Sequence, residues 1–226
     1  WSHVYRSLLP FDEHTGPGLT VAAIIVSKSH QHHPDTIQYL RWKIPCLVEK
    51  PFAMSVHQCE EIIKCAEDNG TYLAAAHVLK FDRRIEQFRD KVGDYVKVIW
   101  TDPCNGRYDP TVPVEADVLP HIVSIIDTLC PGEPIECDGV SFGGRGRDVR
   151  LMAGRTTFDV HLERDAWKRQ RIIDTGYDVL NFSALPEDHN PLRELILSFI
   201  DRLDARLMSP KLALRAARVT EDVLSM

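Results

Sequence analysis

Three residues of this chain have side chains that could move a proton and stabilise charge: Lys50, Asp117 and His121. Histidine has an unperturbed pKa close to neutrality, so it can accept a proton from a substrate at physiological pH. Asp117 and His121 are four residues apart, which places them on one face of a helix, where the carboxylate can fix the tautomer of the imidazole. The ammonium group of Lys50 could stabilise a developing oxyanion. These residue types predict acid-base chemistry on a small molecule.

Taken alone, each of the three residues also fits a structural role. Most lysines are exposed to solvent, and Lys50 precedes Pro51 in what could be a simple turn. Asp117 could cap a helix, and His121 could belong to a core. The segments that surround these residues are therefore needed to decide between the two interpretations.

The first third of the chain predicts alternating strands and helices. Residues 21–26, 45–48 and 72–76 are short apolar runs, as expected of strands buried on both faces of a parallel sheet. Pro34 suits the start of a helix that reaches Trp42, and a second helix runs from a capping box at Ser55 and Gln58 to Gly70. This order is that of the second half of a doubly wound sheet, in which ligands bind beyond the carboxyl ends of the strands. Lys50 stands at such an end.

The rest of the chain predicts a different architecture. Residues 95–100 and 155–162 alternate between apolar and polar, as half-buried antiparallel strands do. Pro120 is tolerated only in the first turn of a helix, so we expect a helix to begin there and to leave Asp117 at its mouth. The glycine-rich residues 142–147 predict a loop or turn between antiparallel strands.

Two helices are expected to close the chain. Asn190 and Pro191 open the first, and Ser209 and Pro210 open the second. The predicted buried face of the first helix consists of apolar residues at helical spacing: Leu192, Leu195, Phe199, Leu203 and Leu207.

The predicted fold class is therefore α/β followed by α+β. A partial doubly wound (Rossmann-like) parallel sheet precedes a C-terminal domain with an open antiparallel sheet and helices, and the terminal helices pack back on the first domain. The change of period between Phe81 and Asp94 places the two domains at residues 1–90 and 91–226.

The segment Glu49-Lys50-Pro51, together with Asp117 and His121, resembles the signature motifs of the Gfo/Idh/MocA family, which includes glucose-fructose oxidoreductase and inositol dehydrogenase. The resemblance implies an oxidoreductase that transfers hydride between a nicotinamide cofactor and a sugar, cyclitol or related hydroxyl compound. It also implies that His121 takes the hydroxyl proton, that Asp117 positions it, and that Lys50 hydrogen-bonds both substrate and cofactor.

The same resemblance implies NAD or NADP as cofactor, contacted by Ser27, His32, Glu49 and Lys50. The chain departs from the family because Ser27-Lys28-Ser29 replaces the usual Thr-Pro-Asn, and because nothing before Val21 reads as a strand, glycine-rich turn and helix that would hold a pyrophosphate. A dinucleotide therefore requires a further segment upstream of Trp1.

If the chain is complete, the same groups could instead catalyse non-redox acid-base chemistry without a cofactor, such as proton abstraction, elimination, isomerisation or cyclisation. A third possibility, a non-catalytic binding subunit, has no need of the complete lysine, aspartate and histidine set.

The composition limits the kinds of molecule that this protein is expected to bind. The net charge of −6 argues against nucleic acid or an anionic membrane, and no apolar run approaches the ~20 residues of a membrane span. The six cysteines lack the close spacing of zinc sites and indicate reduced thiols in the cytoplasm, and no metal is expected. The exposed sheet edge and apolar face of half a doubly wound sheet predict a homodimer or a higher homo-oligomer.

Overall fold

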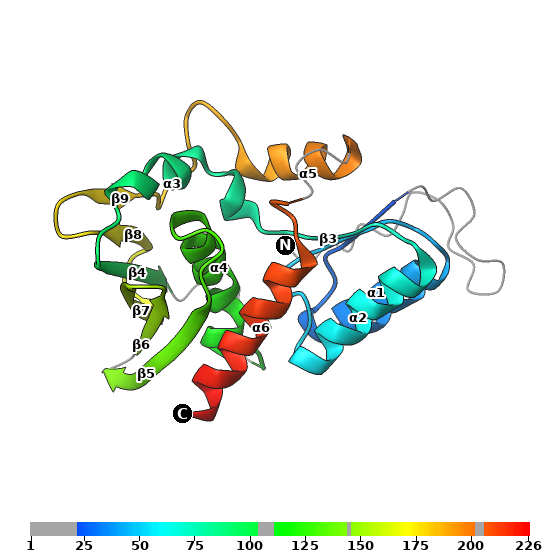
Figure 1. Cartoon of the computed structure of the whole chain (residues 1–226), viewed down its shortest axis with the longest axis horizontal. Helices are drawn as coiled ribbons and strands as arrows, with labels where there is room; N and C mark the ends of the chain where they lie inside the picture. Colours follow the sequence, from blue (N-terminus) through cyan, green and yellow to red (C-terminus); the bar gives the residue numbers. More distant parts are fainter. Residues whose placement is uncertain (1–21, 104–110, 144–145, 202–205) are drawn as a thin grey trace.

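The structure is a computed structural model that describes residues 22–103, 111–143, 146–201 and 206–226. Its strands form two separate sheets, one of three strands and one of six (Figure 1). The predicted fold class is confirmed, with a parallel sheet followed by a second sheet with helices.

The three-stranded sheet contains β1 (Ala23–Ile25), β2 (Cys46–Val48) and β3 (Leu73–Ala75), all parallel and in the order of the sequence. The short 3-10 helix η1 (Ser29–Gln31) and α1 (His32–Arg41) connect β1 to β2, and α2 (Val56–Asn69) connects β2 to β3. In Figure 1, α1 and α2 lie side by side on one face of this sheet. The predicted order of strands and helices is confirmed.

The six-stranded sheet has the order β5-β6-β7-β4-β8-β9. Its strands are β4 (Tyr95–Pro103), β5 (Ile135–Gly143), β6 (Gly146–Ala153), β7 (Thr156–Ala166), β8 (Gln170–Asp174) and β9 (Val179–Asn181). The predicted alternation in β7 is confirmed, because Phe158, Val160 and Leu162 are buried and the residues between them are half-buried. Of the residues 142–147 predicted as a loop or turn, 142, 143, 146 and 147 belong to the paired ends of the antiparallel strands β5 and β6, and 144 and 145 lie outside the described residues.

One pairing differs from the sequence prediction: β4 and β7 are parallel neighbours, while β4 and β8 are antiparallel. The sheet is therefore mixed. Alternation in a sequence shows which face of a strand is buried, but it carries no information on the direction of the neighbouring strand.

Helix α4 (Val114–Leu129) covers the second sheet and begins six residues earlier than predicted, so that Pro120 lies inside it. A proline there leaves the carbonyl of Ala116 without its usual helical donor, at a cost of about 3 kcal/mol. The helix still forms because most of its apolar side chains, among them Leu119 and Ile122, are buried in the hydrophobic core between α4 and the six-stranded sheet. Asp117 therefore lies in the first turn of a long helix.

Short helices connect the two sheets: η2 (Val78–Phe81), α3 (Arg83–Gln87) and η3 (Arg89–Lys91). The chain closes with α5 (Pro191–Asp201) and α6 (Pro210–Ser225), which begin at the predicted prolines. On α5, Leu195 and Phe199 are buried as predicted, but Leu192 is 54% exposed, and Leu203 lies outside the described residues. The face of α5 that carries Leu195 and Phe199 packs against the parallel sheet. Leu192 is not on this face and is therefore exposed to solvent.

Helix α6 contributes side chains to two hydrophobic cores, that of the three-stranded sheet and that of the six-stranded sheet. Its Ala213 packs against the parallel sheet and its helices, whereas Leu212, Ala216, Val219 and Val223 pack with α4 and the six-stranded sheet. Figure 1 shows α6 between the two halves of the molecule. Among the described residues, no helix has the length and apolar character needed to cross a membrane.

Candidate active site

Lys50 and Asp117 are brought into direct contact by the two halves of the molecule. Lys50 follows the carboxyl end of β2, and Asp117 comes from the first turn of α4. The Lys50 Nζ atom donates to Asp117 Oδ1 at 2.5 Å and to the Asp117 carbonyl oxygen at 3.3 Å. Both side chains retain some exposure, 27% for Lys50 and 19% for Asp117. The pair is therefore held firmly and can still be reached from solvent.

A second cation on Asp117 was not anticipated from the sequence. Arg164, near the end of β7, donates from Nη2 to Asp117 Oδ2 at 2.9 Å and from Nη1 to the Val112 carbonyl at 2.7 Å. Arg164 stands in phase with the buried residues Phe158, Val160 and Leu162 of β7. Arg164 could have been found in the sequence from this position, because it is a charged residue on an otherwise apolar face of a strand.

These contacts determine the charge of Asp117. Burial acts to raise the pKa of the carboxyl, but Lys50, and after it Arg164, together hold that pKa below its usual value. Asp117 is therefore ionised at neutral pH and can neutralise cations on either side of it.

His121 lies one turn beyond Asp117 on α4, as the spacing predicted. Its ring stacks on Trp100 of β4, with centroids 5.0 Å apart and an angle of 16° between the planes. Burial, followed by the positive charge of Lys50, holds the pKa of His121 well below its usual value. The imidazole is therefore neutral at physiological pH and able to accept a proton. No described residue forms a hydrogen bond with its ring nitrogens.

The other sequence candidates, Ser27, His32 and Glu49, gather at the same edge of the parallel sheet. The ring of buried His32 contacts two carbonyl oxygens, that of Pro51 at 2.7 Å and that of Ser27 at 2.9 Å. The Ser27 hydroxyl donates to Asp35 at 2.6 Å. His32 thus ties the end of β1 to the loop that carries Lys50.

Glu49 lies against the backbone of the same loop. Its Oε2 atom accepts a hydrogen bond from the Lys50 amide at 2.5 Å. Burial raises the pKa of Glu49, and the Lys50 amide and ammonium only partly oppose this effect. Glu49 therefore stabilises the backbone of the loop, and its carboxyl group gains a proton more readily than an exposed carboxyl group does.

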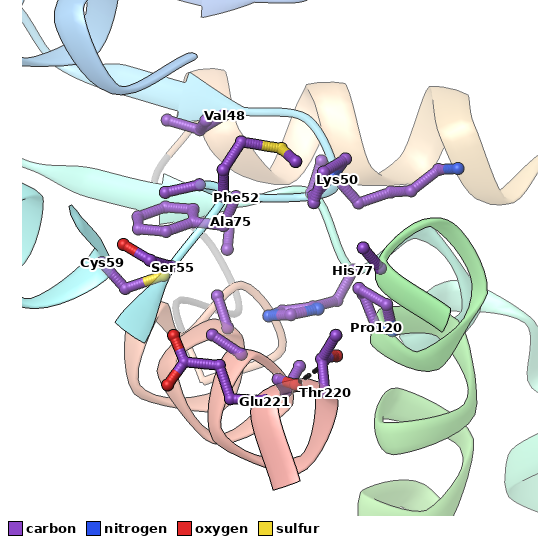
Figure 2. Close-up of a pocket in the computed structure, with 18 of the residues that line it drawn as sticks. Val48, Lys50, Phe52, Ser55, Cys59, Ala75, His77, Pro120, Thr220 and Glu221 are labelled. Carbon is purple, nitrogen blue, oxygen red and sulfur yellow. Dashed lines mark hydrogen bonds between the residues drawn. The ribbon is translucent and has the colours of Figure 1, made fainter. Parts of the chain in front are cut away.

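A cavity of about 140 Å³ lies beneath the Lys50 loop, between the ends of β2 and β3, the first turns of α4, and α6 (Figure 2). Its walls consist mostly of small or apolar side chains, including Val48, Phe52, Ala75, Ala116, Pro120, Ala213 and Ala217. In Figure 2, the side chain of Lys50 extends away from the cavity and that of His77 points into it. The cavity is thus a mostly apolar space directly adjacent to the polar contacts of Lys50.

His77 is a buried polar side chain in the wall of this cavity. Its Nε2 atom lies 3.3 Å from the Ser209 carbonyl, to which it donates. Burial lowers the pKa of His77 to about 4. The ring is therefore neutral at physiological pH, and His77 was not among the predicted site residues.

The described part of the chain contains no cluster of histidine, cysteine, aspartate and glutamate side chains able to hold a metal ion. The described cysteines are all free thiols.

Comparison with known proteins found a matching family model, a curated relative and solved structures of the same fold. Residues 5–77 match the family model described as "Oxidoreductase family, NAD-binding Rossmann fold". A curated relative, 2,7-anhydro-N-acetylneuraminate hydratase from Mediterraneibacter gnavus, is 22% identical over 94 residues, which cover 41% of this chain. The match spans only 25% of the length of that relative.

Solved structures extend the similarity over both sheets. UDP-N-acetylglucosamine 3-dehydrogenase from Acidithiobacillus ferrooxidans superposes with a TM-score of 0.71 at 16% identity, over 90% of this chain and 77% of its own. A 3-ketoreductase from Actinomadura kijaniata, solved with TDP-benzene and NADP, gives 0.69 at 16% identity over 90% and 77%. A dehydrogenase from Clostridium difficile gives 0.71 at 14% identity over 91% and 78%. The family model thus matches less than half of the chain, at residues 5–77, and the solved structures show that the whole described chain shares the fold of these dehydrogenases and ketoreductases.

Proposed function

We propose that this protein transfers hydride between a nicotinamide cofactor, NAD or NADP, and a sugar, cyclitol or related hydroxyl compound. The observation that carries the proposal is the contact of Lys50 with Asp117, one helical turn from the neutral imidazole of His121. This set lies at the carboxyl end of β2, where doubly wound sheets bind their ligands. The NAD-binding family model supports the same proposal.

Each side chain has a distinct role in the proposed reaction. A bound nicotinamide would supply the acceptor for the hydride of the substrate carbon. His121 takes the proton of the hydroxyl group as that carbon becomes a carbonyl. Lys50 donates a hydrogen bond to the same oxygen, and Asp117 together with Arg164 keeps the ammonium in place. Ser27, His32 and Glu49 line or support the edge at which the cofactor would lie.

The edge of the parallel sheet fits a nicotinamide chemically. It offers an ammonium group, a buried carboxyl group and an adjacent cavity with apolar walls. Such a mixture of apolar surface and a few fixed polar groups is typical of cofactor sites.

A second candidate function is acid-base catalysis without a change of oxidation state. The curated relative is named a hydratase, and the described residues hold no glycine-rich turn between a strand and a helix. In this case His121 would abstract a proton and Lys50 would stabilise the oxyanion, so the same residues would act without a nucleotide.

A calorimetric titration with NADH and with NADPH separates the two candidates. We expect binding at micromolar strength, followed by activity in a screen of hydroxyl compounds with the oxidised cofactor. His121→Gln should leave the affinity for NADH unchanged and lower kcat on the order of 10²- to 10⁴-fold, because the proton acceptor is lost. Folded protein that binds neither nucleotide would favour the non-redox candidate.

The proposed enzyme would act on a small molecule in the cytoplasm, a location that fits the free thiols of the described cysteines. It would assemble as a homodimer or higher homo-oligomer through the face of the six-stranded sheet that α4 leaves open. The half-buried residues on that face include Asp159 and His161 of β7. Sedimentation velocity should show a species larger than 25.7 kDa, and a single monomeric species would contradict this assembly.

A further inference from the structure

The cavity beneath the Lys50 loop is large enough for a small ring compound. Its volume of about 140 Å³ is close to that of apolar protein cavities, of about 150 Å³, that bind benzene. The side chain of Lys50 extends away from this space (Figure 2) and donates to Asp117. The space is therefore separate from the polar contacts of the candidate active site, although it lies directly beside them.

The ring of His77 brings an unpaired hydrogen-bond acceptor to this cavity. His77 is only 6% exposed, and its side chain points into the cavity (Figure 2). The Ser209 carbonyl can only accept, so the Nε2 atom 3.3 Å from it carries the hydrogen of the neutral ring. The lone pair is then on Nδ1, which forms no hydrogen bond with any described residue. A buried acceptor without a donor is costly, so Nδ1 is suited to a ligand that donates one hydrogen bond.

Three further polar side chains of the wall are already bonded within the protein. Ser55 accepts from the Gln58 amide at 3.2 Å, where it caps α2. Glu221 accepts from the Val56 amide at 2.7 Å. The hydroxyl of Thr220 donates to a carbonyl of its own helix, α6, at 2.8 Å. Nδ1 of His77 is therefore the polar atom to which a ligand would bind first.

The charges of the wall favour an uncharged ligand. Lys50 is bound to Asp117, and Glu221 is bound to the start of α2 and exposed to solvent. A charged group inside the cavity would lose its hydration among mostly apolar side chains without gaining a free ion-pair partner. A neutral ligand with a single donor avoids this cost.

The cavity also lies between the segments that carry the Lys50–Asp117 pair. Its wall includes Pro51, which follows Lys50, and Ala116, which precedes Asp117. Helix α6 supplies the remaining side through several alanines, among them Ala217. A ligand in the cavity would contact the β2 loop, α4 and α6 together and would hold them at a fixed separation.

We propose that this cavity binds a small uncharged ring compound with one hydroxyl group, which donates a hydrogen bond to Nδ1 of His77 and packs its ring against the alanines of α6. Phenol represents this class of ligand. The site goes beyond the proposed hydride transfer and does not rest on it, because this ligand is neither the cofactor nor the substrate of that reaction.

The test is a titration followed by NMR through the methyl signals of Ala116 and Ala217. The probes are phenol, toluene, which has the same shape but no donor, and two charged controls, benzoate and benzylammonium. We expect saturable shifts with phenol at about millimolar strength, and binding of both charged controls that is at least about tenfold weaker. The absence of a saturable shift with phenol, or tighter binding of either charged control, would overturn the proposal.

Two variants examine the hydrogen bond and the space separately. His77→Phe keeps a ring but removes the acceptor, so the ratio of phenol affinity to toluene affinity should fall about fivefold, which is about 1 kcal/mol. An unchanged ratio in the folded variant would contradict recognition of the hydroxyl group. Ala217→Leu should fill the cavity and abolish the shifts of Ala116, whereas Ala184→Leu, at an exposed position, should retain them. Equal phenol binding by these two leucine variants would place the ligand elsewhere and overturn the site.

A competition with NADH separates this inference from the proposed function. We expect phenol to remain bound when NADH is added, and displacement of phenol by NADH would assign the cavity to the nucleotide instead. A protein that binds phenol here but no nucleotide would support this site and would count against the redox proposal.

Discussion

At the scale of single residues, Asp117 is the carboxylate that two cations share, and its charge depends on both. Replacing Arg164 with methionine keeps most of the apolar stem and removes one of these cations. We expect the pKa of Asp117 to rise, because burial then opposes ionisation with only Lys50 to counter it. Carbon NMR of the Asp117 carboxyl, assigned with Asp117→Asn, measures the change directly.

The matched control is Arg150→Met, which removes an exposed ion pair with Asp159 on the same sheet and should leave Asp117 unaffected. Added guanidinium ions should partly restore the low pKa of Asp117 in Arg164→Met but have no effect in the control. An unchanged Asp117 pKa in folded Arg164→Met would show that Lys50 alone sets the charge of this carboxylate.

The difference between Lys50 and Arg164 explains what the sequence could reveal of the site. Lys50, Asp117 and His121 lie in short motifs, and the resemblance of these motifs to those of the Gfo/Idh/MocA family selected them; residue type and spacing alone also fitted structural roles. Arg164 and Trp100 act through contacts between strands and a helix that are far apart in the sequence. Their partners are defined only once β4 and β7 pair beneath α4. The alternation pattern does not predict that β4 and β7 are neighbours. The contacts of Arg164 and Trp100 that depend on this pairing could therefore not be predicted from the sequence.

At the scale of elements, the end of α2 depends on the backbone of one glycine. Gly70 caps the helix with φ of +59°, and no atom would touch an added Cβ within 4 Å. Gly70→Ala should therefore lower the free energy of unfolding by about 1 kcal/mol, through backbone strain alone. Gly93 is equally open but is not in this left-handed region, so Gly93→Ala should be neutral or slightly stabilising. Urea unfolding compares the two variants, and equal effects would contradict the cap.

The elements themselves were predictable to different degrees. Helix α2 was predicted at both ends because its signals are local: Ser55 accepts from the Gln58 amide at 3.2 Å, and Gly70 ends the helix. Helix α4 was placed too late because Pro120 is a strong local signal against a helix interior. Burial against the second sheet overrides it, and that burial is a property of the tertiary fold rather than of the segment.

At the scale of the whole molecule, α6 and α4 hold the two sheets in a fixed relation. The site exists only because α4 carries Asp117 to the end of β2, and α6 packs against α4 and α2 together. Ion pairs reinforce this arrangement: Asp127 of α4 binds Lys80 of η2 at 2.5 Å and Arg215 of α6 at 3.1 Å. A displacement of α6 would therefore shift α4, and with it Asp117, relative to Lys50, even if no residue of the site were altered.

His77 makes this arrangement sensitive to acid. It follows β3, its ring donates to the Ser209 carbonyl beside the first turn of α6, and its pKa falls from 6.5 to about 4 on burial. Between these two values the unfolded chain binds a proton that the folded chain does not, so stability decreases as the pH falls through this window. Relative to the unaltered protein, His77→Gln should lose about 2 kcal/mol less between about pH 7.5 and about pH 5. His57→Gln, at an exposed position, should retain the full acid dependence, and urea unfolding at the two pH values decides between them. If His77→Gln lost stability in acid as steeply as the unaltered protein, the proton uptake that weakens the junction of the two sheets would have to come from other groups, of which His121 is the next with a lowered pKa.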